Sequence, residues 1–100
     1  NPDFMNTKMN LIAVHFNMGN VDKAFELAAT YPHRYNEPWR NSMKAILFIK
    51  AQKYLETTKD SLLANYLNLQ LSKNPHYLLN EYIKSEKSGQ TFEKELAVKP

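Results

Sequence analysis

Residues 10–27 read NLIAVHFNMGNVDKAFEL, and this stretch decides the fold class. Before Gly19, apolar residues recur every three or four positions, which is the spacing of one face of an α-helix. Gly19 tolerates the positive φ that closes a helix, and a second segment with helical spacing follows it. Ala24 in that second segment is small enough to let two paired helices approach closely. The stretch therefore predicts two helices joined by a tight glycine turn.

Helical spacing continues along the rest of the chain, and no segment alternates with the period of a β-strand. Residues 57–60 match a capping box, and residues 74–75 (Asn-Pro) match a helix start with an asparagine cap. The sequence predicts five helices, near residues 4–18, 20–31, 38–55, 60–72 and 75–87. Phe92 and Leu96 are four positions apart and predict a short last turn.

The predicted helices recur at a period of about 35 residues, which is typical of helix-pair solenoids. We expect an all-α chain of antiparallel helix pairs, stacked as a fragment of an α-solenoid. The expected organisation is one helical-repeat domain over residues 1–100, with helix pairs at 4–31 and 38–72, a helix at 75–87 and a tail. The chain starts without methionine, so we interpret it as a piece of a longer protein.

The composition fits a folded chain and argues against several kinds of site. Hydrophobic residues make up 43% and charged residues 23%, as in folded rather than disordered proteins. The absence of cysteine excludes disulfides, thiolate zinc sites and cysteine nucleophiles. His15, His33 and His76 have no ligand-like partners three or four positions away. With only 2 glycines a phosphate-binding loop is not expected, so we expect no enzyme, metal, cofactor or small-molecule substrate.

The net charge of +3 is small and evenly spread along the chain. Residues 1–50 carry 6 basic and 4 acidic side chains, and residues 51–100 carry 7 and 6. A dedicated nucleic-acid domain more often shows a concentrated basic face, so this charge is compatible with RNA without favouring it. The sequence has no window of about 18 apolar residues, which predicts no membrane span.

The quoted stretch resembles a pentatricopeptide (PPR) repeat. That family shows a Leu-Ile pair in its first helix, a Gly-x-x-x-x-Ala turn and Glu-Leu in its second helix. The matching residues here are Leu11, Ile12, Gly19, Ala24, Glu26 and Leu27. Tetratricopeptide (TPR) repeats share the turn, but Ile12 and His15 stand where that family has a small residue and an aromatic one. A TPR-like repeat or an unrelated helical domain remains an alternative.

The PPR resemblance implies an α-solenoid that binds single-stranded RNA, usually in mitochondria or chloroplasts. Its base-reading positions fall on Met9 and near Trp39, which cannot form the expected hydrogen bonds, although a Trp39 ring can stack on a base. Several polar residues of the first and third helices are candidates for phosphate contacts. These candidates are Asn6, Lys8, Asn10, Arg40 and Lys44.

Residues 32–40 (PHRYNEPWR) place two arginines, Arg34 and Arg40, and two aromatic residues between the predicted helix pairs. Loop residues often make contacts, so Arg34 and Trp39 join the candidate RNA-binding residues. The alternative is a rigid linker in which Trp39 anchors the next helix. The leading interpretation is a non-catalytic scaffold in an organellar RNA or ribosome-associated assembly, mitochondrial by resemblance and otherwise intracellular. Its partners would be single-stranded RNA or ribonucleoprotein and other protein subunits; the alternative is a TPR-like protein–protein adaptor without RNA contact.

Overall fold

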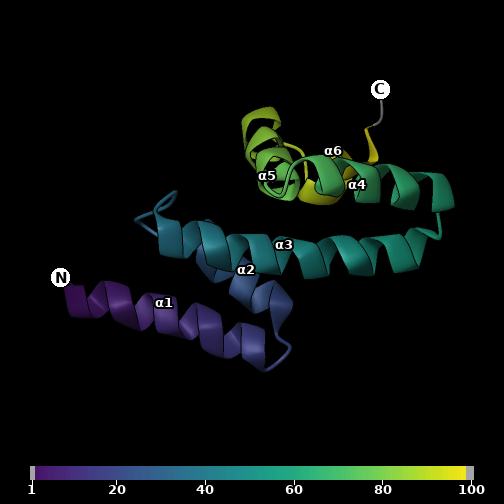
Figure 1. Cartoon of the computed structure of the whole chain (residues 1–100). Helices are drawn as coiled ribbons and strands as arrows, with labels where there is room; N and C mark the ends of the chain where they lie inside the picture. The colour runs from purple at the N-terminus through teal and green to yellow at the C-terminus, as the bar shows by residue number, and fades with distance from the viewer. Residues whose placement is uncertain (1, 99–100) are drawn as a thin grey trace. The chain divides into compact units, whose positions relative to one another are not determined.

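A computed structural model describes residues 2–98, with side chains described from Thr7 to Val98. This part of the chain contains six α-helices and no β-strand (Figure 1). They are α1 (Pro2–Asn17), α2 (Val21–Ala29), α3 (Glu37–Thr58), α4 (Ser61–Lys73), α5 (Tyr77–Ser88) and α6 (Phe92–Ala97). The all-α prediction is confirmed, and each of the five expected helices is present.

The last helix, α6, is more than the short turn that the sequence indicated. Thr91 caps it, because its Oγ1 accepts a hydrogen bond from the backbone N–H of Lys94 at 3.2 Å. Phe92 and Leu96, which lie on one side of the helix, are both buried. Their burial against the neighbouring helices stabilises a segment too short to be helical alone.

The predicted capping box over residues 57–60 is wrong. Helix α3 continues through Thr58, so the two threonines lie in its last turn rather than before the next helix. Asp60 is the cap of α4, since its carboxylate accepts a hydrogen bond from the backbone N–H of Leu63 at 3.0 Å.

Helix α5 also begins later than predicted. The Asn74 side chain accepts a hydrogen bond from the backbone N–H of His76 at 2.9 Å. The residues that were expected to begin the helix therefore form a turn. The helix itself starts at Tyr77. A short polar side chain can accept a hydrogen bond from any of several nearby backbone N–H groups, and the sequence alone does not determine which one.

The chain divides into two compact units, residues 1–46 and 47–100, and their boundary lies inside α3. The first half of α3 belongs with α1 and α2, whereas its second half belongs with α4, α5 and α6. A long helix with apolar residues on several faces can contribute to two cores. One helical-repeat domain over residues 1–100 stays a prediction.

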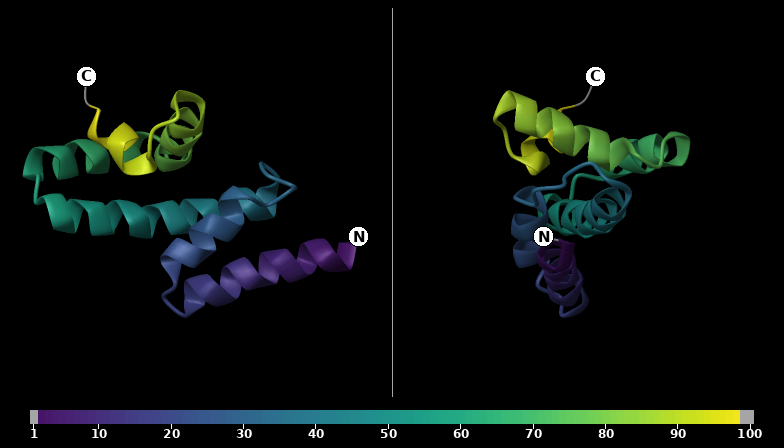
Figure 2. Two further views of the ribbon diagram at one scale, coloured as in Figure 1. Left: turned by 180° about the vertical axis from the view of Figure 1, so that it is seen from behind. Right: turned by 90° about the vertical axis from the view of Figure 1, so that its left-hand side faces the viewer.

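In the first unit, α1 and α2 form an antiparallel pair joined by a short turn, which Figure 2 shows from two sides. Gly19 closes α1 with a φ of 82°, as the sequence predicted. Ala24 and Ala28 of α2 are fully buried, which leaves no room for larger side chains at these positions. The Trp39 indole N–H donates to the Ala28 carbonyl at 2.7 Å and so attaches the start of α3 to α2.

In the second unit, α4 runs antiparallel beside the second half of α3, and α6 packs against α5 (Figures 1 and 2). An ion pair between Lys50 and Glu93, at 3.4 Å, joins α3 to α6. Gly89 ends α5 with a φ of 75°, which confirms the predicted glycine stop. The buried apolar residues of this unit are Leu47, Ala51, Leu63, Leu67, Leu78, Leu79, Tyr82, Phe92 and Leu96.

Candidate interaction sites

The loop between α2 and α3 rests on a buried tryptophan. Asn36 precedes α3, and its side-chain oxygen accepts a hydrogen bond from the backbone N–H of Trp39 at 2.9 Å. This bond places Trp39 in the first turn of α3, where its side chain is fully buried. Because the indole N–H is already bonded to the Ala28 carbonyl, Trp39 fixes the loop to the helix beneath it.

Tyr35 lies over this tryptophan, with ring centroids 5.1 Å apart. Its φ is 72°, a left-handed conformation that is strained for a bulky side chain. The Arg40 guanidinium donates to the Tyr35 backbone carbonyl and holds the residue in this conformation. Even so, 48% of Tyr35 remains exposed to solvent.

Arg34 completes the arrangement from the other side of the tyrosine. Its guanidinium carbon lies 5.2 Å from the centroid of the Tyr35 ring and 5.7 Å from that of Trp39, within the range of cation–π attraction. Its Nη2 donates to the Tyr35 hydroxyl at 3.3 Å. We call Arg34, Tyr35 and Arg40 the loop cluster: one exposed ring, one guanidinium near that ring, and a second guanidinium on the backbone carbonyl of the same tyrosine.

The structure corrects the role expected for Trp39. A fully buried ring cannot stack on a nucleobase, so Trp39 is the anchor of α3 rather than an RNA contact. The exposed ring of this loop is Tyr35, which the sequence reasoning did not select. The signal for it was present, because Tyr35 follows Arg34 in a segment with many turn formers, but nothing in the sequence shows which of the two rings is buried.

The other candidate residues lie on α1 and α3. Lys8 lies half-buried on α1, and Lys44 lies half-buried on the first half of α3. The side chain of Asn6 lies outside the described residues. Met9, the position expected to read a base, accepts a hydrogen bond at its Sδ from the Ser42 hydroxyl at 3.7 Å, so it packs toward α3.

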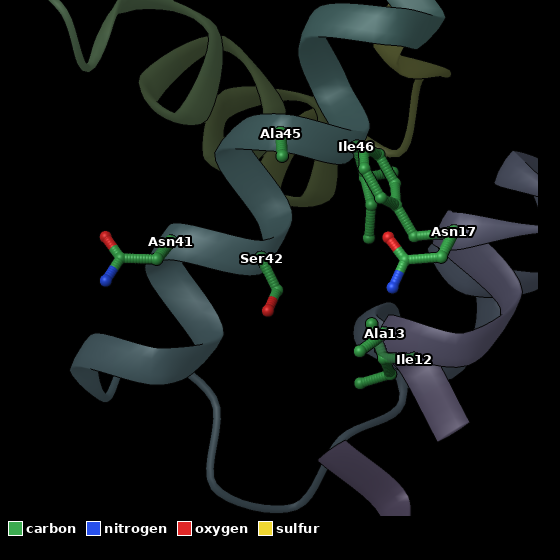
Figure 3. A pocket seen from close by; sticks show the side chains of 8 residues that line it. Ile12, Ala13, Asn17, Asn41, Ser42, Ala45 and Ile46 are labelled. Atoms are coloured by element: carbon green, nitrogen blue, oxygen red, sulfur yellow. The ribbon is translucent and has the colours of Figure 1, made fainter. Parts of the chain in front are cut away.

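A pocket of about 250 Å³ lies between α1 and the first half of α3 (Figure 3). Its lining consists of Ile12, Ala13, Phe16 and Asn17 from α1 with Asn41, Ser42, Ala45 and Ile46 from α3. Ile12 and Ile46 are fully buried and form its floor, whereas Ala13 and Ala45 are exposed at its sides. None of the eight lining residues carries a charge. We call this feature the α1/α3 pocket.

The polar groups of the α1/α3 pocket are few and come from both helices. Figure 3 shows Asn17 extending from α1 toward α3, with Ser42 projecting from α3 into the same space, while Asn41 points outward at the far edge. An amide offers both a donor and an acceptor, which are the two groups that a peptide bond needs. The sequence did not indicate this pocket, because its residues are small and lie on helices whose relative register only the structure gives.

Polar side chains of the second unit contact one another instead. Glu81 is buried, and its carboxylate is 3.0 Å from the ammonium group of Lys84. This partner raises the pKa of Lys84, because the carboxylate favours the charged form. Burial raises the pKa of the Tyr77 hydroxyl, and the neighbouring Glu81 carboxylate raises it further. These interactions join side chains of one helix, since Tyr77, Glu81 and Lys84 all belong to α5.

Among residues 2–98, no group of three or more His, Asp or Glu side chains is placed to hold a metal ion. In the same part of the chain, every helix is too short or too polar to cross a membrane. Comparison of the chain with family models, with curated proteins and with solved structures finds no match. The loop cluster and the α1/α3 pocket are therefore the candidate interaction sites of this chain.

Proposed function

We propose that the chain is a non-catalytic helical-repeat scaffold, similar to PPR proteins, that contacts single-stranded RNA through the loop cluster. The observation that carries this proposal is the exposed Tyr35 ring, which has the Arg34 guanidinium 5.2 Å from its centroid and the Arg40 guanidinium on its backbone carbonyl. Proteins bind single strands by stacking bases on aromatic rings and by neutralising phosphates with basic side chains. The loop cluster offers both kinds of group within one short segment.

The strain at Tyr35 supports a functional use of this segment. A left-handed conformation at a bulky residue is unfavourable and persists only where surrounding contacts hold it, which is typical of functional sites. Here the contacts come from Arg40 at the carbonyl and from Trp39 beneath the ring. The ring is therefore already fixed for stacking before a base arrives.

Stacking of the helix pairs as an α-solenoid and an organellar, mitochondrial location are also part of this proposal. The resemblance of residues 10–27 to a PPR repeat supports them. We expect binding to depend weakly on base sequence, because Met9 packs toward Ser42 and cannot offer a hydrogen bond to a base edge. Other protein subunits would supply any sequence preference of the assembly.

A second candidate function is a TPR-like protein–protein adaptor without RNA contact. The observation that favours it is the α1/α3 pocket, which is lined only by uncharged residues. The two candidates use different residues of the same unit, so they can be tested separately.

Fluorescence anisotropy of labelled single-stranded RNA with the full chain, at several salt concentrations, tests the RNA proposal. Affinity should fall with salt, because each neutralised phosphate contributes a log–log slope of about −0.7. Replacing Arg34 and Arg40 together by Ala should make the slope shallower by up to about 1.4. The matched control is Lys53→Ala with Lys87→Ala, which removes the same charge from exposed positions of the second unit.

Tyr35 gives the test of stacking. Tyr35→Ala should weaken binding by about 1–3 kcal/mol, the usual contribution of one stacked base, whereas Tyr35→Phe keeps the ring and should bind nearly as well as the parent. Absence of binding at low salt would contradict the proposal. Equal losses of RNA affinity in the arginine variant and the lysine control would also contradict it, because binding would then depend on net charge and not on where the charges lie.

A further inference from the structure

We propose that the α1/α3 pocket binds one large apolar side chain of a partner protein, presented by an extended segment with acidic residues beside it. This goes beyond the RNA contact, and it depends on different residues. The pocket is about 250 Å³ in volume and has a buried floor of Ile12 and Ile46. An apolar side chain placed on this floor leaves water, which is the main source of favourable free energy in such contacts.

The uncharged lining selects against other occupants. A charged group placed in the pocket would lose its hydration without meeting an opposite charge, which is strongly unfavourable. A phosphate is excluded for this reason, because no Lys or Arg lies among the lining residues. The small side chains of Ala13 and Ala45 leave the space open from the solvent side. A neutral, bulky side chain therefore fits better than a nucleotide.

Asn17 and Ser42 indicate how the flanking backbone is held. They extend toward the pocket from opposite helices, as Figure 3 shows. An extended peptide segment must satisfy its N–H and C=O groups when it is covered, and the Asn17 amide can both donate to and accept from such a segment. The Ser42 hydroxyl donates its hydrogen to Met9 Sδ, and the lone pairs of its oxygen can accept a peptide N–H.

The charges around the pocket favour acidic neighbours in the partner. Among the described side chains of α1 and of residues 41–46, Lys8 and Lys44 are basic, and Asp and Glu are absent. Lys8 lies one helical turn before Ile12, and Lys44 directly precedes Ala45 in the chain. Complementary charge of this kind steers a partner and disfavours basic segments.

Selection of a displayed library of random short peptides on the full chain tests the inference. The selected peptides should share one large apolar residue with Asp or Glu nearby. Ala45→Phe fills the pocket from an exposed position, so it should fold normally and weaken these peptides about tenfold or more. Asn65→Phe, at an exposed position of α4, is the matched control and should leave affinity unchanged.

Side-chain methyl NMR signals locate the peptide directly. Addition of a selected peptide should shift the signals of Ile12 and Ile46, which form the floor, and not that of Ile83 in α5. Asn17→Ala should weaken binding less than Ala45→Phe does. Selection of basic peptides, or equal binding to Ala45→Phe, would overturn the inference. If Ala45→Phe abolishes RNA binding while replacement of Arg34 and Arg40 by Ala does not, the pocket binds RNA instead. If only the replacement of Arg34 and Arg40 abolishes RNA binding, the pocket and the RNA site are distinct.

Discussion

The two compact units differ in the features that stand out on each. In residues 47–98 these are ion pairs between the unit's own side chains: Lys50 pairs with Glu93, and Lys84 pairs with the buried Glu81. In residues 7–46 they are the exposed Tyr35 ring of the loop cluster and the α1/α3 pocket, which opens to solvent with an uncharged lining. The first unit thus has an exposed aromatic ring and an open pocket that a partner can reach.

This contrast matters because both units obey the same rules of helix formation. Each has a glycine with positive φ at a helix end and a row of buried apolar residues on its helices. Function is therefore not visible in the helical pattern, and it has to be sought where the pattern is interrupted. The loop between α2 and α3 is such an interruption, whereas the α1/α3 pocket lies between two regular helices.

The largest expected effect comes from Trp39, which lies beneath the loop cluster. Trp39→Ala should lower the free energy of unfolding by about 3–5 kcal/mol, because a fully buried indole is replaced by a cavity. Urea unfolding followed by circular dichroism measures this. A loss of less than about 1 kcal/mol would mean that the ring is not part of a packed core, and stacking on RNA would become its role again.

A smaller effect on unfolding free energy distinguishes the core of the first unit from its open pocket. Ala24→Leu should cost about 1–3 kcal/mol in unfolding free energy, because Ala24 is fully buried and has no room for a larger side chain. Ala13→Leu, at an exposed position of the pocket, should change stability by less than about 0.5 kcal/mol. Similar urea midpoints for the two variants would remove the distinction between core and binding surface.

The helical fold was predictable because it depends on local spacing. The Gly19 and Gly89 stops, five of the helices and the absence of strands from residues 2–98 all follow from patterns a few residues long. The exact starts of α4 and α5 do not follow from such patterns, because Asp60 and Asn74 each have several backbone N–H groups within reach. The division of α3 between two units depends on contacts between distant segments, which no local pattern contains.

The candidate sites were less predictable for the same reason. Arg34 and Arg40 were predicted from their charge, and in the structure both contact the same residue, Arg34 at the Tyr35 ring and Arg40 at its backbone carbonyl. The wrong ring was selected, since burial of Trp39 depends on the Ala28 carbonyl from another helix. The α1/α3 pocket had no local signal at all, because its eight residues are ordinary apolar, alanine, serine and asparagine positions until α1 and α3 are brought together.

The smallest expected effect tests whether the polar groups of the second unit are indeed used internally. Tyr77 should contribute less than about 1 kcal/mol at neutral pH through its hydroxyl near the Glu81 carboxylate, because the residue is only partly buried and solvent screens the interaction. Burial and this carboxylate raise the pKa of Tyr77 above its ordinary value, so at alkaline pH the folded chain binds more protons than the unfolded chain. The contribution is then fully present below about pH 10 and is lost as pH rises further.

Urea unfolding at a series of pH values through the alkaline range measures this loss, and Tyr77→Phe should show a shallower decline than the parent chain because it has no hydroxyl to ionise. The direction of the change is informative, because a tyrosine with a lowered pKa in the folded state would make the protein more stable as pH rises. Equal pH dependence in the two forms would show that Tyr77 is free to ionise in the folded state. The hydroxyl would then be open to solvent, and the second unit would present a polar group outward as the first unit does.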